Sequence, residues 1–278
     1  MDTQRFDEIN KLLRYLVITS TTKAGSGHPT TCLSAIELMS VLFFNGHYHY
    51  DLSNPHNPKN DRVIFSKGHA APLLYALYSV AGAISHDELM TLRDKNSRLE
   101  GHPTPEFAYA EAATGSLGQG LSIGLGIALA GAPGVYVLMG DGEVAEGNIW
   151  EAAAVAGHYK TSRLTGILDV NRLGQSDPTM LGWDTKTYRD RFTSFGWHAI
   201  VVENGHDVRE VNKAYAEALT IKNKPQVIIA KTDKGHGISF LENKEGWHGK
   251  PVPAEQLEAA LKELGKVDLQ LTAEIEKP

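Results

Sequence analysis

Residues 135–146 read Val-Tyr-Val-Leu-Met-Gly-Asp-Gly-Glu-Val-Ala-Glu, an apolar run that leads into a Gly-Asp-Gly turn. The apolar run over Val135–Met139 predicts a short buried strand. Gly140 and Gly142 would let the backbone approach a ligand closely, and a helix expected over Val144–His158 would favour an anion at its N-terminus. The stretch therefore places one carboxylate, that of Asp141, beside a turn suited to an anion.

A second strand end supplies a matching polar group. Asn171 directly follows an apolar run over Thr165–Val170, and in open parallel sheets ligands bind beyond the carboxyl ends of the strands. Mg²⁺ prefers oxygen ligands completed by phosphates and water, which Asp141, the Asn171 amide and the Leu173 carbonyl would offer. A Gly-Asp-Gly sequence alone is often only a turn, but its context here favours a site for Mg²⁺, or another divalent cation such as Ca²⁺ or Mn²⁺, and a diphosphate.

Strands and helices alternate along the rest of the chain, which predicts right-handed crossovers and an α/β fold. The fold class expected is a three-layer α/β/α arrangement with a mainly parallel sheet, built as a single domain over residues 1–278. The expected strands are Arg62–Phe65, Val135–Met139, Thr165–Val170, His198–Val202 and Gln226–Ala230. The expected helices are Phe6–Thr21, Ser34–Phe44, Ala70–Ala81, His86–Arg93, Leu117–Ala130, Val144–His158, Tyr188–Phe195, Val208–Leu219 and Pro253–Leu264.

Composition excludes several classes of protein. The formal charge of −6 makes nucleic acid an unlikely general partner. Cys32 is the only cysteine, so no disulfide framework exists and a cytoplasmic location is expected. The uncharged run Ala112–Gly140 is long enough to span a membrane, but Pro133 and Gly134 interrupt it with a turn, so no membrane span is expected.

Six motifs then occur in order along the chain. They are Lys23-Ala24-Gly25-Ser26-Gly27-His28-Pro29, Ser66-Lys67-Gly68-His69-Ala70, Gly101-His102-Pro103, Thr114-Gly115-Ser116-Leu117-Gly118-Gln119-Gly120, Gly140-Asp141-Gly142 with Glu146-Gly147, and Trp247-His248-Gly249. Over nearly its whole length the chain resembles the N-terminal, diphosphate-binding portion of a transketolase.

The resemblance implies a thiamine diphosphate cofactor with a divalent metal held by Asp141, Asn171 and the Leu173 carbonyl. Two positions depart from the family pattern. Val170 stands where Asn is common in the wider thiamine-diphosphate group, and Thr30-Thr31 replaces a small Gly after His-Pro. The first leaves the metal ligand unchanged, and the second alters packing near the substrate.

Four of the twelve histidines lie in loops flanked by Gly or Pro. A lone loop histidine is usually a surface residue, but four in this fold are expected to converge at the strand ends. The resemblance places His28, His102 and His248 along the substrate channel, and it has His69 and His248 reach the diphosphate. Imidazoles suit this chemistry because ketose cleavage takes a proton from one hydroxyl and returns one to another near neutral pH.

Two further segments carry alternatives. The resemblance makes Gly115, Ser116 and Leu117 part of a loop that approaches the cofactor, whereas Ser116 is also placed to cap a helix. Glu146 matches a carboxylate that couples paired active sites across the partner chain, whereas its position also suits a favourable charge at a helix N-terminus. A Gly-His-Gly at His236 is a weaker candidate for another site histidine.

The resemblance also implies that this chain is catalytically incomplete. In transketolases the glutamate and aromatic pocket that serve the pyrimidine ring lie in a following domain. We therefore expect a separate C-terminal transketolase subunit that supplies the pyrimidine-binding half, in an α2β2 assembly acting on sugar phosphates. The expected reaction is transfer of a two-carbon ketol unit from a ketose phosphate to an aldose phosphate.

Two other interpretations remain open. One is half of another thiamine-diphosphate enzyme, similar to deoxyxylulose-phosphate synthase or to a 2-oxo acid dehydrogenase. The other is a non-catalytic scaffolding relative. The loop histidines favour a ketose donor, whose hydroxyls they would bind, and intact Asp141 and Asn171 argue against the non-catalytic alternative.

Overall fold

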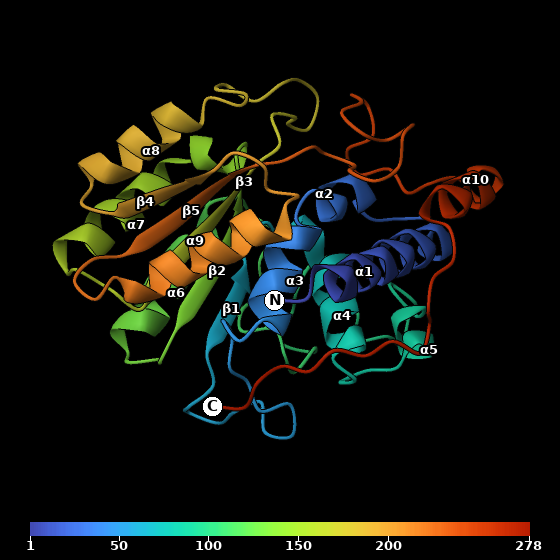
Figure 1. The fold of residues 1–278 in the computed structure, drawn as a ribbon, viewed down its shortest axis with the longest axis horizontal. Helices are drawn as coiled ribbons and strands as arrows, with labels where there is room; N and C mark the ends of the chain where they lie inside the picture. The colour runs from blue at the N-terminus through green and yellow to red at the C-terminus, as the bar shows by residue number, and fades with distance from the viewer.

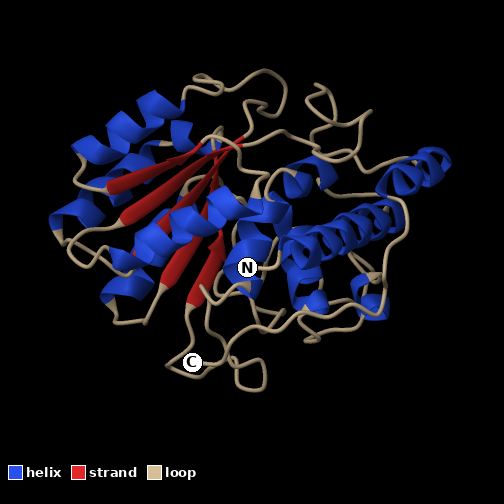
Figure 2. Cartoon of the chain, in the orientation of Figure 1, coloured by secondary structure: helices blue, strands red, loops and turns tan.

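Five buried strands form one parallel sheet in the order β1-β2-β3-β5-β4 (Figures 1 and 2). The computed structural model describes all residues, Met1–Pro278. The strands are β1 (Arg62–Phe65), β2 (Val135–Gly140), β3 (Leu164–Val170), β4 (His198–Val202) and β5 (Gln226–Lys231). Each strand boundary lies within one residue of its predicted position, because each strand is a buried apolar run with sharp flanking breaks.

Alternation of side chains along each strand creates two hydrophobic layers. In β2, Val135, Val137 and Met139 pack into the cluster on one face, whereas Tyr136 and Leu138 pack into the cluster on the other. Successive strand residues point to opposite faces, so an uninterrupted apolar run requires helices on both sides. The predicted three-layer α/β/α fold is confirmed.

Helices cover both faces and extend beyond the β1 edge of the sheet (Figure 1). One face carries α6 (Gln119–Leu129), α7 (Gly147–His158) and α8 (Thr185–Ser194), and the other carries α9 (Val208–Thr220), against which α3 (Ile36–Phe44) packs. The remaining helices are α1 (Thr3–Ala24), α2 (Pro29–Leu33), α4 (Ala71–Val80), α5 (His86–Leu89) and α10 (Ala254–Leu264), with short 3₁₀ turns η1 (Gly68–Ala70) and η2 (Glu143–Ala145).

Two predicted helices are shorter in the structure. The helix expected over residues 34–44 begins at Ile36. It is preceded by a separate helix, α2, which begins at Pro29, a residue whose fixed φ favours the first helical position. The helix expected over residues 86–93 ends at Leu89. Arg93 has a φ of 62°, a left-handed conformation that no α-helix accommodates.

The two helices nearest Gly140-Asp141-Gly142, the turn predicted to bind the metal and called the metal turn below, also begin later than predicted. α6 starts at Gln119 after Gly118, whose φ is 87° and which has no side chain to act as a cap. The Ser66 hydroxyl accepts the N–H of Gly120 in its first turn at 3.0 Å. The alternative role of Ser116 as a helix cap is therefore wrong. α7 starts at Gly147, because Glu146 is extended and separates it from the 3₁₀ turn η2.

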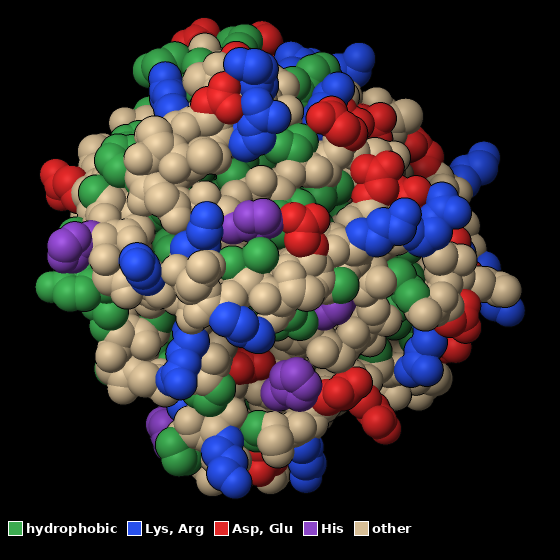
Figure 3. All heavy atoms as spheres, turned by 60° about the vertical axis from the view of Figure 1, so that its left-hand side comes forward, with side chains coloured by type: hydrophobic (Ala, Val, Ile, Leu, Met, Phe, Trp, Pro, Cys, Tyr) green, Lys and Arg blue, Asp and Glu red, His purple; other side chains and the backbone are tan.

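The surface carries both signs of charge. On the face drawn in Figure 3, basic and acidic side chains are interspersed and no broad patch has a single sign. The uncharged run over residues 112–140 forms a loop, α6 and β2. None of the helices combines the length and the apolar character that crossing a bilayer requires.

A buried polar clamp anchors the long irregular segment after β5. Arg14 of α1 pairs with Glu37 of α3, and Glu37 Oε2 also receives His206 Nδ1 at 3.0 Å. His206 Nε2 accepts the backbone N–H of Asp233 at 2.8 Å, so its proton resides on Nδ1 and points at Glu37. Arg14 Nε donates to the carbonyl of His236 at 3.2 Å. We call these five residues the loop clamp, since they fix the start of the segment 232–253.

The tight contact between α6 and the sheet predicts opposite effects for two glycines of one helix. A Cβ at Gly124 would lie 2.5 Å from Cγ2 of Val137, whereas a Cβ at Gly126 meets no atom within 4 Å. Gly126→Ala should stabilise the chain by up to about 1 kcal/mol through helix propensity. Gly124→Ala should destabilise it by about 1–3 kcal/mol through overpacking. Urea unfolding of both variants measures the difference, and equal effects would contradict the packing described.

The loop clamp predicts an acid-sensitive contribution to stability. Burial by itself would raise the pKa of Glu37, but Arg14 and His206 outweigh it and lower the pKa from 4.5 to about 2. A depressed carboxyl pKa stabilises the fold above the unfolded value and loses that effect as pH falls towards the folded value. Between about pH 4.5 and 2, the wild-type unfolding free energy should therefore fall more steeply than that of Glu37→Gln. Parallel profiles, with exposed Glu255→Gln as the control, would refute this.

Candidate functional site

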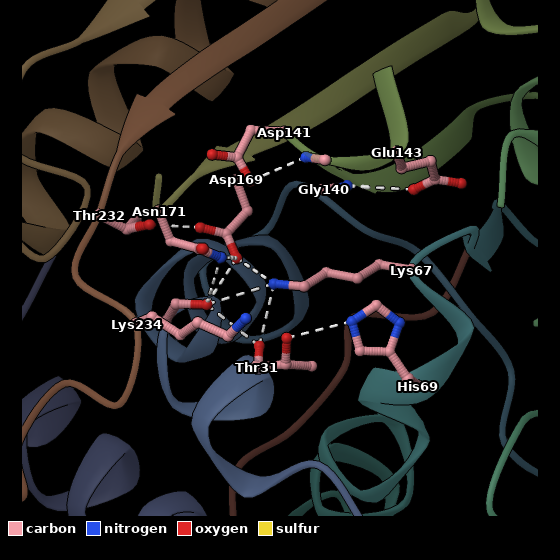
Figure 4. A network of polar contacts seen from close by, with 12 residues as sticks. Thr31, Lys67, His69, Gly140, Asp141, Glu143, Asp169, Asn171, Thr232 and Lys234 are labelled. Carbon is pink, nitrogen blue, oxygen red and sulfur yellow. Dashed lines mark hydrogen bonds and ion pairs between the residues drawn. The ribbon is translucent and has the colours of Figure 1, made fainter. Parts of the chain in front are cut away.

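The carboxyl ends of β1, β2, β3 and β5 surround one cavity of about 250 Å³. Parallel strands end at the same edge, so residues that follow different strands meet there. The predicted residues that line it are His28, His69, His102, Gly115, Leu117, Gly140, Asp141, Gly142, Asn171, Leu173 and His248. Six lining residues were not predicted: Thr31, Lys67, Glu143, Gly174, Gln175 and Lys234. Figure 4 shows part of this cavity wall from close by, with Asp141, Asn171 and the lysines Lys67 and Lys234 among the labelled residues.

Asp141 is held rigidly at the end of β2. Its Oδ2 accepts the backbone N–H of Arg172 at 2.6 Å and the hydroxyl of Thr179 at 3.0 Å. Burial, together with the charge of Asp169, raises the pKa of Asp141 to about 6. A carboxylate in this situation gains from a cation beside it, since an opposite charge favours its ionised form.

The other two predicted metal ligands lie at the end of β3. Asn171 Nδ2 faces Asp169 Oδ2 at 3.3 Å, which leaves the amide oxygen on the opposite side, where it accepts the N–H of Leu173 at 3.2 Å. The Leu173 carbonyl accepts Lys234 Nζ at 2.7 Å, and its second lone pair stays free for another partner. One carboxylate and two neutral oxygens on the wall of one cavity are a donor set that fits a hard divalent cation.

A fully buried ion pair lies beneath these ligands. Lys67, which follows β1, pairs with Asp169 of β3, and their side chains are 2% and 0% exposed. Lys67 Nζ also donates to the Thr31 carbonyl at 3.0 Å, and Asp169 accepts the hydroxyls of Ser34 and Thr232. Burial alone would raise the pKa of Asp169, but Lys67 and these hydrogen bonds lower it. The Asp169 carboxylate is therefore favoured in its ionised form, and its contacts join the ends of several elements.

Lys234 brings a second ammonium group to the cavity wall. Its Nζ donates to the carbonyls of Leu173 and Gly174 and, at 3.1 Å, faces Nδ1 of His248. Burial and the charge of Lys67 lower the pKa of Lys234 to about 8. Because an ammonium group only donates, Nδ1 of His248 acts as an acceptor here. The proton of His248 is then on Nε2.

The four loop histidines come together around His28. Its ring centroid lies 5.1 Å from that of His69, 4.9 Å from that of His248 and 6.2 Å from that of His102. Burial is the main cause that lowers the pKa of His28 and His248 to about 4, and the pKa of His69 and His102 is also lowered. All four imidazoles are thus neutral near pH 7, the form that can accept a proton.

The amides of the Gly-Asp-Gly turn serve the protein itself. Gly140 N–H donates to Glu143 Oε2 at 3.1 Å, and Gly142 N–H donates to Asp141 Oδ1 at 3.0 Å. The helix expected from Val144 begins only at Gly147, and none of its residues lines the cavity. The three N–H groups of Lys234 also have partners within the protein, in Leu173, Gly174 and His248. The cavity wall therefore offers an anion the positive charge of this lysine and the imidazole rings.

Two residues named from the sequence do not line the cavity. Ser116 and Glu146 are exposed, and neither is among the lining residues. Glu146 precedes α7 instead of lying inside it, because its backbone is extended. His236 also lies elsewhere, since its ring stacks on that of His206 in the loop clamp at a centroid distance of 3.6 Å.

The sequence did not predict the roles of Lys67 and Lys234, because both depend on partners that are far away along the chain. Lys67 lies within a quoted motif, but its partner Asp169 is 102 positions away. A signal existed, because Asp169 is the one charged residue in the apolar strand Leu164–Val170, and a buried charge needs a partner. Lys234 offered no such signal, since it lies in a polar, irregular segment.

Comparison with known proteins places the chain in a family. The family model described as "Transketolase, thiamine diphosphate binding domain" matches residues 6–276. The chain is 50% identical over 264 residues to the transketolases of Rattus norvegicus and Homo sapiens, which covers 93% of this chain and 41% of each relative. The chain thus spans about two-fifths of the length of these curated relatives. The resemblance based on the six motifs is confirmed, and so is the predicted thiamine diphosphate cofactor.

A shorter relative and solved transketolase structures are also similar to this chain. The apulose-4-phosphate transketolase subunit of Phocaeicola vulgatus is 37% identical over 249 residues, which is 88% of this chain and 88% of that protein. The transketolase structure from Campylobacter jejuni matches 99% of this chain and 45% of its own, with a TM-score of 0.89 and 33% identity. The Leishmania mexicana transketolase structure matches with a TM-score of 0.88 and 30% identity.

Proposed function

Because the chain belongs to the transketolase family, as its thiamine diphosphate binding domain, we propose that residues 1–278 form the metal- and diphosphate-binding half of a ketol transferase. The reaction proposed is the reversible transfer of a two-carbon unit from a ketose phosphate to an aldose phosphate. One observation carries the proposal above all. A hard-cation donor set and four neutral imidazoles share the wall of a single cavity.

We assign the metal to Asp141, Asn171 and the Leu173 carbonyl, with Mg²⁺ as the preferred ion. Mg²⁺ typically takes one or two protein oxygens and completes its shell with phosphates and water. The raised pKa of Asp141 supports the assignment, because a divalent cation would offset the cost of burying this carboxylate. Lys67 and Lys234 supply two further positive charges to the same wall.

We assign the diphosphate to side chains instead of turn amides. Lys234 and His69 line the cavity beside the metal ligands, and Lys234 would contribute its positive charge, since its N–H groups already donate within the protein. The uncharged N–H groups of Gly140 and Gly142 are engaged as well. His69 Nε2 lies 3.1 Å from the Thr31 hydroxyl, which orients its ring. These groups would bind and orient the diphosphate while the metal neutralises its charge.

His28, His102 and His248 are the residues that we assign to the sugar. Bound thiamine diphosphate supplies the carbon nucleophile of ketol transfer. The chain's own task is then to hold the sugar hydroxyls and to move protons. A neutral imidazole accepts a hydroxyl proton and returns one to the product. The Nε2–H of His248, oriented by Lys234, would donate to a sugar oxygen.

We further propose that a separate subunit completes the active site. The support is the Phocaeicola vulgatus relative, which its name designates as one subunit of a transketolase and whose length this chain covers to 88%. Apolar side chains beside the metal turn offer a docking surface for that second subunit, since Leu117 is 41% and Met180 80% exposed. Two copies of each subunit would form an α2β2 assembly. We place it in the cytoplasm, because a reducing compartment preserves the buried free thiol of Cys32.

Asp141→Ala should abolish magnesium-dependent uptake of thiamine diphosphate by the assembled enzyme. The affinity should fall by more than about 100-fold, since even residues behind a metal ligand contribute about 10- to 100-fold. Calorimetric titration of the cofactor with Mg²⁺, and with EDTA in its place, measures this. Asp7→Ala, which changes an exposed aspartate of α1, is the matched control. Uptake that is unchanged in Asp141→Ala would refute the metal assignment.

The chain alone should show no ketol transfer, and its partner subunit should restore it. Consumption of xylulose phosphate by the assembly supports the proposed reaction, whereas consumption of pyruvate supports the other thiamine-diphosphate enzymes. Full activity from the isolated chain would refute the two-subunit proposal.

In the active assembly, His28→Ala should lower kcat by about 10²- to 10⁴-fold, the usual contribution of a proton-transfer group. The cofactor uptake of this variant should be retained.

A further inference from the structure

Glu143 is a buried carboxylate in the cavity wall to which the proposed reaction gives no role. It lies two residues after Asp141, and it is 2% exposed. Its Oε1 accepts the Ser66 hydroxyl and, at 2.9 Å, the N–H of Gly118, while its Oε2 accepts the N–H of Gly140 at 3.1 Å. Figure 4 shows this carboxylate beside the metal turn.

The three donors to Glu143 come from three separate segments. Ser66 follows β1, Gly118 precedes α6 and Gly140 ends β2. The segment after β1 packs closely against the segment that leads into α6. A Cβ on Gly120 would lie 2.3 Å from the Ser66 Cβ, and a Cβ on Gly68 would lie 2.7 Å from the backbone nitrogen of Gly115. The carboxylate therefore joins these two closely packed segments to the end of β2.

Both oxygens of Glu143 accept hydrogen bonds from the protein. A carboxylate only accepts hydrogen bonds, and here every partner is a donor. Glutamine has the same shape but one NH₂ group. Whichever way its amide turns, that NH₂ would face the N–H of either Gly118 or Gly140, and two donors cannot bond. The site thus requires the ionised carboxylate itself.

We propose that Glu143 is a positioning residue, which fixes the loop Gly115–Leu117 relative to the metal turn so that both hold one cofactor molecule. Gly115, Leu117 and Asp141 all line the same cavity. The inference rests on the proposed function, since it concerns the same cofactor. Its consequence is specific: the loss of Glu143 weakens cofactor binding without slowing the reaction of the bound cofactor.

The test compares Glu143→Gln with Glu258→Gln in the assembled enzyme, since Glu258 is an exposed residue of α10. For Glu143→Gln, half-saturation by thiamine diphosphate should rise by about 10- to 100-fold, the range typical of residues behind a metal ligand. The kcat at saturating cofactor should stay within about threefold, because the reacting groups remain in place. Direct calorimetric uptake should show the same loss of affinity, and Glu258→Gln should match the wild type.

Unchanged half-saturation would overturn the proposal, and so would a kcat that falls at saturating cofactor while half-saturation stays constant. If Glu143→Gln does not fold, Ser66→Ala decides. It removes the hydroxyl donor to Glu143 and the acceptor of the Gly120 N–H, and it leaves both amide bonds to the Glu143 carboxylate. A raised half-saturation then supports the positioning role, and an unchanged one refutes it. Wild-type enzyme that takes up no cofactor would instead refute the proposed function, so the two failures are distinguishable.

Discussion

The buried ion pair between Lys67 and Asp169 is the constraint on which the site depends. Removing one partner of such a pair leaves an uncompensated charge in the interior, which costs several kcal/mol. Here that charge would lie directly beside Asn171, the proposed metal ligand whose amide faces Asp169. Ser34 and Thr232 add hydrogen bonds from the region before α3 and from the end of β5. One interaction thus sets the distances among elements that are far apart in sequence.

Charge balance explains why the cavity wall combines acidic and basic groups, each of which would be costly to bury alone. Burial disfavours the ionised forms of Asp141 and Lys234, as the shifted pKa values of both show. Placing cations and anions on one wall limits this cost. The same burial keeps His28 and His248 neutral. A diphosphate with its metal ion would complete this balance, and the neutral imidazoles would remain available for proton transfer.

The parts of the fold that follow from local patterns were predictable. Each strand is an apolar run between breaks, so the five strands and the α/β class could be predicted from the sequence. The metal turn was predictable for the same reason, because Asp141 and Asn171 directly follow such runs. Helix ends were less predictable. The left-handed backbone of Arg93 and the extended backbone of Glu146 are set by the loops around them, and no local pattern marks them.

The sequence by itself determined the layers, the edge of the sheet where a ligand binds, and the residue types that meet there. Hydrophobic periodicity and strand direction are sufficient for these, since both act over a few residues. Only the tertiary structure decided which charges pair and which donors stay free. Lys67 meets Asp169 across 102 positions, and Lys234 meets the Leu173 carbonyl across 61. Such pairings depend on how loops pack in space, because a charged side chain in a loop has many partners within reach until the sheet brings one of them close.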